Sequence, residues 1–497
     1  MKQVMDSTEQ TILQINDFSL AFEEKNSQQT IFKKANLSIK SGEIIGLVGP
    51  SGSGKSVLAR AIFNAWSFES VCQSGEIIYI ENNKKRNLIT KKRGANNDVY
   101  GKHISMVFQE PKLAFNPVIR VGRQIIEVAK KHLMLTEKEA YEEAVKTLSL
   151  LSLDHSFLKP FPHELSGGQL QRLMIAMAII SKPKLIIADE PTTSLDTVSQ
   201  KQILELFKFL NQKRDMALLM ITHNQAVLNF INAKTYQLEN QALKPKQESL
   251  SAVPRAINRA SLSQDLILST SNLSFSYNPK NSVLNNISLS LNKGEILGIV
   301  GSSGSGKSTL AKVLSKLENG DSKIEPNFKI GDVQLIFQHP GSALDPSQKA
   351  ISVITEALKI AGVKPKPERL KKANELLVKV GFPLDHSQKH PFQLSGGQKQ
   401  RLCIARALCI KPKVLICDEP VSSLDAHLKN QIIDILIDLN TTQGLPIIFI
   451  SHDIELVANI CQRILVLEKG EIVEETSYQK LKNARSNALK ELVNAQI

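Results

Sequence analysis

Short, unbroken apolar runs recur along the chain and end at glycine or at acidic residues. EIIGLVG (43–49) and EILGIVG (295–301) lead into glycine-rich turns, whereas KLIIADEP (184–191) and KVLICDEP (413–420) end in paired carboxylates. Such runs, bounded by turn residues, are typical of parallel strands buried on both faces. KSVLARAIF (55–63) has its apolar residues at helical spacing instead. The pattern predicts an α/β fold.

The apolar runs are too short to cross a membrane. None reaches the roughly 18 uninterrupted apolar residues that a spanning helix needs. The first residues, MKQVMDSTEQTILQ, are polar and lack the apolar core of a signal peptide, so we expect the protein to stay where it is made.

The composition is that of an ordinary soluble globular protein, but the charge is strongly basic. Hydrophobic residues make up 42% and charged residues 22%, with a formal net charge of +14. A basic balance is compatible with nucleic acid, with an anionic membrane surface, or with solubility alone. The densest basic stretch, Asn82 to Lys102, lacks regularly interleaved aromatic residues, which favours a solvated hairpin or loop over a nucleic-acid platform.

The whole pattern occurs twice. LSGGQLQR (165–172) returns as LSGGQKQR (394–401), 229 residues later, whereas the glycine-rich turns are 252 residues apart. The first half therefore has 23 extra residues (252 minus 229), and they include GEIIYIENNKKRNLITKK (75–92), which predicts a strand pair with a polar connection. We expect a first domain at residues 1–240, a polar linker at 241–265 and a second domain at 266–497.

Each glycine-rich turn has the context of a phosphate-binding loop. GPSGSGKS (49–56) and GSSGSGKS (301–308) each join a predicted buried strand to a helix, as the motif G-x-x-x-x-G-K-S requires. The glycines let backbone N–H groups surround phosphate oxygens, and the helix start adds partial positive charge. We expect the lysines Lys55 and Lys307 to reach the β and γ phosphates of a nucleotide, with the serines Ser56 and Ser308 as Mg²⁺ ligands.

The paired carboxylates and the LSGGQ segments complete a nucleotide-hydrolysing set. The first carboxylate of each pair, Asp189 or Asp418, is expected to hold Mg²⁺ through water, and the second, Glu190 or Glu419, to act as general base toward the attacking water. The serine of each LSGGQ can cap a helix and offer a second anion-binding helix start. Because the phosphate loop already occupies one face of the nucleotide, we expect each LSGGQ to face the nucleotide held by the other half.

With these motifs in both halves, the chain resembles the ATP-binding cassette (ABC) ATPases. The resemblance implies two tandem P-loop NTPase domains, each with a mainly parallel sheet core, an antiparallel β subdomain and a helical subdomain. It implies that the glutamines after VF and IF touch Mg²⁺, that the histidines in MITHN and FISHD contact the γ phosphate, and that an aromatic residue in each half stacks on adenine. It also assigns SLD (194–196 and 423–425) to D-loops.

Together these arguments give one candidate set. The candidate catalytic residues are Glu190, Glu419, His223 and His452. The candidate ATP-binding residues are Phe22, Gly49, Pro50, Ser51, Gly52, Ser53, Gly54, Lys55, Ser56, Val57, Gln109, Ser166, Gly167, Gly168, Gln169, Asp189, Tyr277, Gly301, Ser302, Ser303, Gly304, Ser305, Gly306, Lys307, Ser308, Thr309, Gln338, Ser395, Gly396, Gly397, Gln398 and Asp418. The candidate Mg²⁺ ligands are Ser56, Gln109, Asp189, Ser308, Gln338 and Asp418.

The segments after the two glutamines narrow the resemblance. EPKLAFNPVIRVGRQI (110–125) and HPGSALDPSQKAISVI (339–354) are similar to the segment with which dipeptide, oligopeptide and nickel importer ATPases meet their permeases. The resemblance implies ATP-driven peptide uptake through two transmembrane permease subunits with a periplasmic solute-binding protein. It places the chain peripherally on the cytoplasmic face of a bacterial inner membrane, without nucleic acid.

Two alternatives stay open. The solute could differ, with nickel, glutathione or an antimicrobial peptide as candidates. A soluble ABC ATPase acting on ribosomes or nucleic acid is the other class. Against it, the stretch from Glu239 to Asp265 is shorter than the charged helical linker usual in ribosomal members, and no inserted cysteine pairs for zinc occur.

Overall fold

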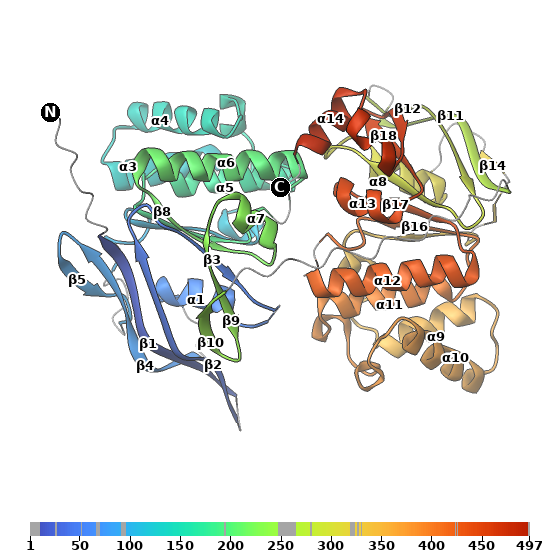
Figure 1. The fold of residues 1–497 in the computed structure, drawn as a ribbon, viewed down its shortest axis with the longest axis horizontal. Helices are drawn as coiled ribbons and strands as arrows, with labels where there is room; N and C mark the ends of the chain where they lie inside the picture. Colours follow the sequence, from blue (N-terminus) through green and yellow to red (C-terminus); the bar gives the residue numbers. More distant parts are fainter. Residues whose placement is uncertain are drawn as a thin grey trace. The chain divides into compact units, whose positions relative to one another are not determined.

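The chain folds as two compact α/β units. The computed structural model describes residues 10–24, 27–50, 52–65, 70–90, 96–192, 195–246, 265–278, 281–318, 324–325, 328–329, 331–422, 424 and 426–495. The first unit is made mainly of residues 1–251 and the second mainly of residues 252–496 (Figure 1).

Two sheets and their helices make up the described part of the first unit. Its strands are β1 (Thr11–Glu24), β2 (Ser27–Lys40), β3 (Ile44–Val48), β4 (Ser70–Glu81), β5 (Lys84–Asn87), β6 (Ile104–Val107), β7 (Leu185–Asp189), β8 (Ala217–Ile221), β9 (Lys234–Glu239) and β10 (Ala242–Pro245). Its α-helices are α1 (Lys55–Ile62), α2 (Pro111–Ala114), α3 (Val121–Leu133), α4 (Glu137–Leu150), α5 (Gly167–Ile179), α6 (Thr197–Arg214) and α7 (Gln225–Phe230), with short 3₁₀ helices at His155–Leu158 and Pro162–Glu164.

The two sheets differ in strand direction. The sheet β2-β1-β4-β5 is antiparallel throughout. In the sheet β10-β9-β3-β8-β7-β6, every neighbouring pair is parallel except β9 with β10. Helix α1 and the antiparallel sheet cover one face of the larger sheet, and α5 and α6 cover the other (Figure 1).

Burial of the larger sheet on both faces explains the unbroken apolar run of β7. Side chains of successive strand residues point to opposite faces. Leu185 and Ile187 pack in the core shared with α1 and β1, whereas Ile186 and Ala188 pack against α5 and α6. All four side chains are fully buried, so both faces need apolar residues and the run cannot alternate with polar ones.

The second unit repeats this architecture. Its strands are β11 (Leu266–Asn278), β12 (Asn281–Asn292), β13 (Ile296–Val300), β14 (Ile324–Glu325), β15 (Val333–Ile336), β16 (Val414–Asp418), β17 (Ile447–Ile450), β18 (Arg463–Glu468) and β19 (Glu471–Thr476). Its α-helices are α8 (Lys307–Leu314), α9 (Ala350–Ile360), α10 (Lys366–Lys379), α11 (Gly396–Leu408), α12 (Ala426–Gln443), α13 (Ile454–Ile460) and α14 (Asn487–Asn494), with 3₁₀ helices at Pro340–Ala343, Leu384–His386, Pro391–Gln393 and Tyr478–Asn483. The sheets have the orders β12-β11-β14 and β15-β16-β17-β13-β18-β19.

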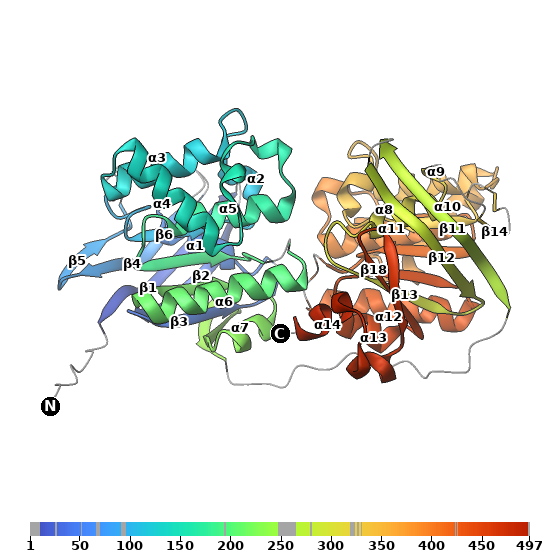
Figure 2. The same cartoon turned by 90° about the horizontal axis from the view of Figure 1, so that it is seen from above.

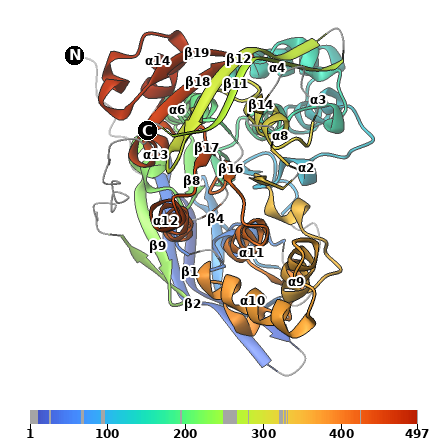
Figure 3. The ribbon, with the colours of Figure 1, turned by 90° about the vertical axis from the view of Figure 1, so that its right-hand side faces the viewer.

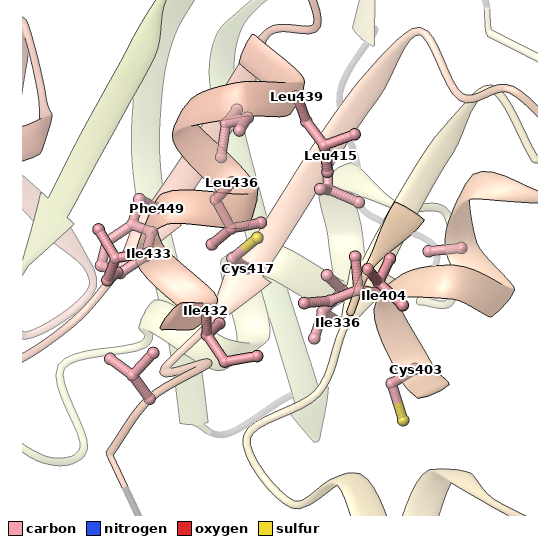
Figure 4. Close-up of a cluster of buried hydrophobic side chains, with 14 of the residues drawn as sticks. Ile336, Cys403, Ile404, Leu415, Cys417, Ile432, Ile433, Leu436, Leu439 and Phe449 are labelled. Carbon is pink, nitrogen blue, oxygen red and sulfur yellow. The ribbon is translucent and has the colours of Figure 1, made fainter. Parts of the chain in front are cut away.

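Helices pack on the second sheet as they do on the first. Figure 4 shows Leu415 and Cys417 of β16 in one apolar cluster with Leu436 and Leu439 of α12. A helical group stands beside each sheet, with α3 next to α4 in the first unit (Figure 2) and α9 next to α10 and α11 in the second (Figure 3). The predicted fold class, with a mainly parallel core, an antiparallel β part and a helical part in each half, is confirmed.

Strand order brings the repeated motifs of each half to one edge of the larger sheet. Strands β3, β8, β7 and β6 are parallel neighbours, so their carboxyl ends lie at the same edge. The phosphate loop follows β3, the paired carboxylates end β7, and the candidate glutamine and histidine follow β6 and β8. Strands β13, β17, β16 and β15 make the same arrangement in the second unit.

The predicted strand pair after residue 75 is confirmed, but part of the predicted linker is a strand. β4 and β5 pair antiparallel, and the turn residues Asn82 and Asn83 have φ of 48° and 62°, as a two-residue hairpin turn requires. Residues 242–245 of the expected linker instead form β10, because Leu243 packs against the core of the first unit. Residues 247–264 lie outside the described residues, and a linker there stays a prediction.

Within the described ranges, no helix combines the length and apolar character that crossing a bilayer requires.

Candidate nucleotide-hydrolysing sites

The phosphate loops adopt a backbone that needs glycine. Gly54 and Gly306 precede α1 and α8 with φ of 102° and 104°, a region that L side chains rarely adopt. Gly49 allows a close approach, since a Cβ there would stand 2.7 Å from the carbonyl oxygen of Leu238. The loop can therefore turn sharply and place the first turn of each helix next to the end of its strand. Ser51 lies outside the described residues.

Both loop lysines are buried inside their own loops. Lys55 Nζ donates to the carbonyl oxygens of Gly49 and Pro50 at 2.9 and 2.8 Å, and Lys307 Nζ donates to those of Gly301 and Ser302 at the same distances. Burial lowers the pKa of Lys307, while the carboxylates of Glu419 and Asp418 oppose that shift. A cation held by loop carbonyls is well placed to exchange them for phosphate oxygens, which carry full charge.

Strands β7 and β16 each end in a buried aspartate that lies beside the serine of the phosphate loop. Asp189 and Asp418 are only 4% and 5% exposed, and their Oδ1 atoms have no hydrogen-bond partner within the described part of the chain. Burial raises the pKa of both carboxyls, and a side-chain hydrogen bond with Ser56 or Ser308 opposes the rise. A buried oxygen without a partner, next to a hydroxyl, fits a hard divalent cation that prefers oxygen ligands.

The second carboxylate of each pair turns to the same edge because its backbone is left-handed. Glu190 and Glu419 both have φ of 47°, which is strained for a residue other than glycine and is typical of functional sites. In an extended strand, neighbouring side chains would point to opposite faces. The reversed φ removes that alternation at the strand end.

In each unit, this glutamate carboxylate joins the candidate glutamine to the candidate histidine. In the first unit, Gln109 Nε2 donates to Glu190 Oε2 at 3.2 Å, and His223 Nδ1 lies 3.2 Å from Glu190 Oε1. In the second unit the corresponding distances to the carboxylate of Glu419 are 2.8 Å for Gln338 and 3.1 Å for His452. Three residues that are 33 and 81 positions apart thus meet at one carboxylate in each unit.

The charge state of this carboxylate suits a base. Burial by itself would raise the pKa of Glu419, but the hydrogen bond and charge of His452, with Lys307 and Gln338, hold the pKa below its ordinary value. Glu419 is therefore ionised at neutral pH and can accept a proton.

The LSGGQ serines cap their helices, as predicted. Ser166 Oγ accepts from Gln169 N at 3.3 Å, and Gln169 Oε1 accepts from Ser166 N at 3.0 Å. Ser395 and Gln398 repeat this capping box at 3.3 and 3.1 Å. Among the described residues, no side-chain hydrogen bond of these four reaches the phosphate loop of the same unit. Gly168 and Gly397 lie in the first turns of α5 and α11, and the starts of both helices are exposed at Gly167 and Gly396.

The remaining loop and aromatic candidates fall at matching positions. Phe22 lies on β1, two residues after Leu20, which pairs with Phe32 of β2. Tyr277 lies on β11, two residues after Phe275, which pairs with Leu284 of β12. Tyr277 is 51% exposed, and its ring packs perpendicular to that of Phe275 with the centroids 4.8 Å apart, so stacking on adenine by Tyr277 stays a prediction. The other candidates lie in the two glycine-rich turns (Gly52, Ser53, Ser303, Gly304 and Ser305) or in the first turns of α1 and α8 (Val57 and Thr309). Ser194, Ser423 and Asp425 of the two D-loops lie outside the described residues.

Sequence reasoning missed three residues, Gln171, Arg172 and Arg401, that connect elements around the two sites. Gln171 is buried, and its Nε2 donates at 2.8 Å to the carbonyl oxygen of Pro191, directly after Glu190. Arg172 Nη2 donates at 3.1 Å to Gln202 Oε1 of α6, and Arg401 makes the corresponding contact with Gln431 of α12. The sequence contained a sign of these residues, because a Gln-Arg pair follows LSGGQ after one residue in both halves.

Comparison with known proteins identifies close matches to both halves. The family model described as ABC transporter matches residues 32–193 and 284–422. The Glutathione import ATP-binding protein GsiA of Salmonella choleraesuis (strain SC-B67) is 34% identical over 535 residues, covering 93% of this chain and 86% of that protein. The protein of the same name from Pectobacterium atrosepticum is 32% identical over 539 residues, covering 94% and 86%. A solved structure titled RNase-L Inhibitor is 19% identical, covers 94% of this chain and 91% of its own, and has a TM-score of 0.66, which shows a shared fold.

Proposed function

We propose a function from one premise: the chain belongs to the ABC transporter family and is an ATPase. On that premise, its ATP hydrolysis powers the uptake of small peptides through separate membrane permease subunits. The observation that carries this proposal is the 34% identity, over 93% of the chain, to a glutathione import ATP-binding protein. Glutathione is a tripeptide, so it falls within the proposed solute class and is the first solute to test.

We propose that hydrolysis proceeds alike in the two units. Gly49 to Val57 and Gly301 to Thr309 would hold the phosphates, with Lys55 or Lys307 on the β and γ phosphates. Ser56, Asp189 and Gln109, or Ser308, Asp418 and Gln338, would hold Mg²⁺, which when bound offsets the charge of the phosphate oxygens.

The glutamate then acts on water. Glu190 or Glu419 takes one proton from a water molecule as the water oxygen bonds to the γ phosphorus. The bond from that phosphorus to the β–γ bridging oxygen breaks, which gives ADP and inorganic phosphate. His223 or His452, already hydrogen bonded to the glutamate, steadies the carboxylate and lies ready to contact the γ phosphate.

We also propose that each LSGGQ helix start serves the nucleotide held by the other unit. Support comes from each unit alone: Ser166 and Ser395 cap exposed helix starts, which carry partial positive charge. A photoreactive residue in place of Gly396, in a chain that cannot hydrolyse ATP, should cross-link to the peptide containing residues 49–56 only when ATP is present. Cross-linking that is the same with and without ATP, or that never involves this peptide, would contradict the proposed position of the LSGGQ helix start.

A surface next to Gln109 supports a membrane partner. Phe108 and Val118 are 43% and 78% exposed, while Phe115 between them is 4% exposed and anchors the segment. Apolar side chains that are exposed in the free chain gain free energy when a protein partner buries them. We propose that this segment, and the one after Gln338, contact two permease subunits on the cytoplasmic face of a bacterial inner membrane. A periplasmic solute-binding protein would deliver the solute.

Affinity purification from the cells that make the chain tests the function. Membranes dissolved in mild detergent should yield two permease proteins with the tagged chain. Uptake of labelled glutathione and of labelled dipeptides should fall to background in cells carrying only the Glu190→Gln, Glu419→Gln chain. Recovery of ribosomal proteins without permeases, or uptake that persists, would refute the proposal and favour a soluble role.

A further inference from the structure

The turns that carry the two candidate histidines share the same kind of hydrogen bonds. In the first unit, Asn224 N donates to Thr222 Oγ1 at 3.1 Å, and Asn224 Oδ1 accepts from Ala226 N at 3.0 Å to cap α7. In the second unit, Asp453 N donates to Ser451 Oγ at 3.0 Å, and Asp453 Oδ1 accepts from Leu456 N at 3.0 Å to cap α13. The change from Asn to Asp after the histidine therefore leaves the turn and the cap in place.

The second turn has an additional tie to another helix. The other oxygen of Asp453, Oδ2, accepts a hydrogen bond from Lys429 Nζ of α12 at 2.6 Å. The two side chains are 34% and 29% exposed, so solvent screens this ion pair only in part. Burial would raise the pKa of Asp453, but Lys429 and the cap hold that pKa below its ordinary value, so Asp453 stays ionised at neutral pH.

The first unit has neither partner of this pair. The position 229 residues before Lys429 is Gln200, and its Nε2 donates to Thr192 Oγ1 at 3.1 Å rather than to the histidine turn. The position matching Asp453 is the neutral Asn224. An ion pair between these two positions is therefore impossible in the first unit.

The tie acts one residue away from a candidate catalytic side chain. His452 immediately precedes Asp453, and its Nδ1 lies 3.1 Å from Glu419 Oε1. α12, which holds Lys429, packs in the same core as β16, the strand that ends before Glu419. Lys429 thus fixes the turn of His452 to a helix that is itself packed on the strand of Glu419. Small displacements of reacting groups cost large factors in rate, so such a restraint affects turnover.

We propose that Lys429 is a positioning residue for the second ATP site, and that the lack of its counterpart makes the two sites unequal, with the histidine of the second unit better restrained. The inference rests on the proposed roles of His452 and Glu419. It deepens them by assigning a kinetic difference to a named pair of residues.

Substitution of Lys429 tests the inference in the full-length chain. Lys429→Gln, which copies the first unit, should lower kcat for ATP roughly threefold to tenfold with KM unchanged. Lys429→Arg keeps the charge and should restore most of kcat. Gln200→Ala is the matched control in the first unit and should leave kcat within about a factor of 1.5, since Gln200 makes no such tie. The paired variant Gln200→Lys, Asn224→Asp should raise kcat.

The outcomes separate the inference from the function on which it rests. A Lys429→Gln chain with unchanged kcat, or one whose loss of kcat is matched by a loss of folded protein in circular dichroism, would overturn the positioning role. An Arg variant as slow as the Gln variant would do the same. If Glu419→Gln also leaves turnover unchanged, the assignment of the site has failed instead.

Discussion

Replacing the two glutamates at the strand ends tests the proposed chemistry most directly. Glutamine is nearly isosteric with glutamate, and in Glu190→Gln its carbonyl oxygen can still accept from Gln109 Nε2, which lies 3.2 Å from Glu190 Oε2. The amide group can face His223 Nδ1, now 3.2 Å from Oε1, if that nitrogen carries no proton. The fold and the nucleotide contacts should therefore survive, while the ability to accept a proton is lost.

The expected loss follows from that single change. General base catalysis contributes about 10²- to 10⁴-fold, which corresponds to about 2.7–5.4 kcal/mol of activation free energy. The Glu190→Gln, Glu419→Gln chain should lose that factor in steady-state phosphate release with MgATP. If the sites work independently, the Glu190→Gln chain should keep more than half of the activity and the Glu419→Gln chain less than half, because the second site is the faster one. Both single variants should keep much less if the sites alternate.

Three controls make the result decisive. Binding of a fluorescent ATP analogue and the thermal unfolding temperature should match the unsubstituted chain, and Glu205→Gln, an exposed position on α6, should leave turnover unchanged. If the double variant binds ATP normally and keeps more than about a tenth of the turnover, these glutamates are not the general bases.

Other consequences follow from buried or partly buried ionisable groups in the second unit. Because burial raises the pKa of Asp418, its ionised form destabilises the fold, so Asp418→Asn should raise the nucleotide-free unfolding temperature by roughly 2–4 °C if about 1 kcal/mol is recovered. The same variant should lose stabilisation by MgATP, and a lower melting temperature without nucleotide would contradict the reasoning. The lowered pKa of Asp453 adds stability that is lost as the pH falls below the unfolded-state pKa near 3.8. Lys429→Gln should therefore weaken the dependence of the unfolding free energy on pH in the acid range. Urea titrations at several pH values that show the same dependence for both chains would count against the ion pair. The thiols of Cys403, Cys409, Cys417 and Cys461 are buried, and burial raises their pKa, to about 11 for Cys403 and about 12 for Cys409. They should therefore resist a thiol reagent until the second unit unfolds, which mass spectrometry can measure. Labelling within minutes in native buffer would contradict this prediction.

The sequence by itself determined the features that depend on near neighbours. Phosphate loops, helix caps and the β4–β5 turn involve residues within about ten positions, so their backbone needs are written directly into local residue types. Ser166 and Gln169 illustrate this, since each satisfies the other's backbone group three residues away. The α/β class and the strand that carries Asp189 could be predicted for the same reason, and the repeat could be predicted because the same local motifs occur twice.

The tertiary structure decided what depends on strand order and on small differences between the copies. Gln109, Glu190 and His223 meet because β6, β7 and β8 are parallel neighbours, an order that an apolar run does not encode. The tie between Lys429 and Asp453 joins residues 24 positions apart on different elements, and neither residue is unusual by itself. Long-range contacts depend on how whole elements pack, and for that reason the pattern alone predicts two candidate ATP sites but does not distinguish between them.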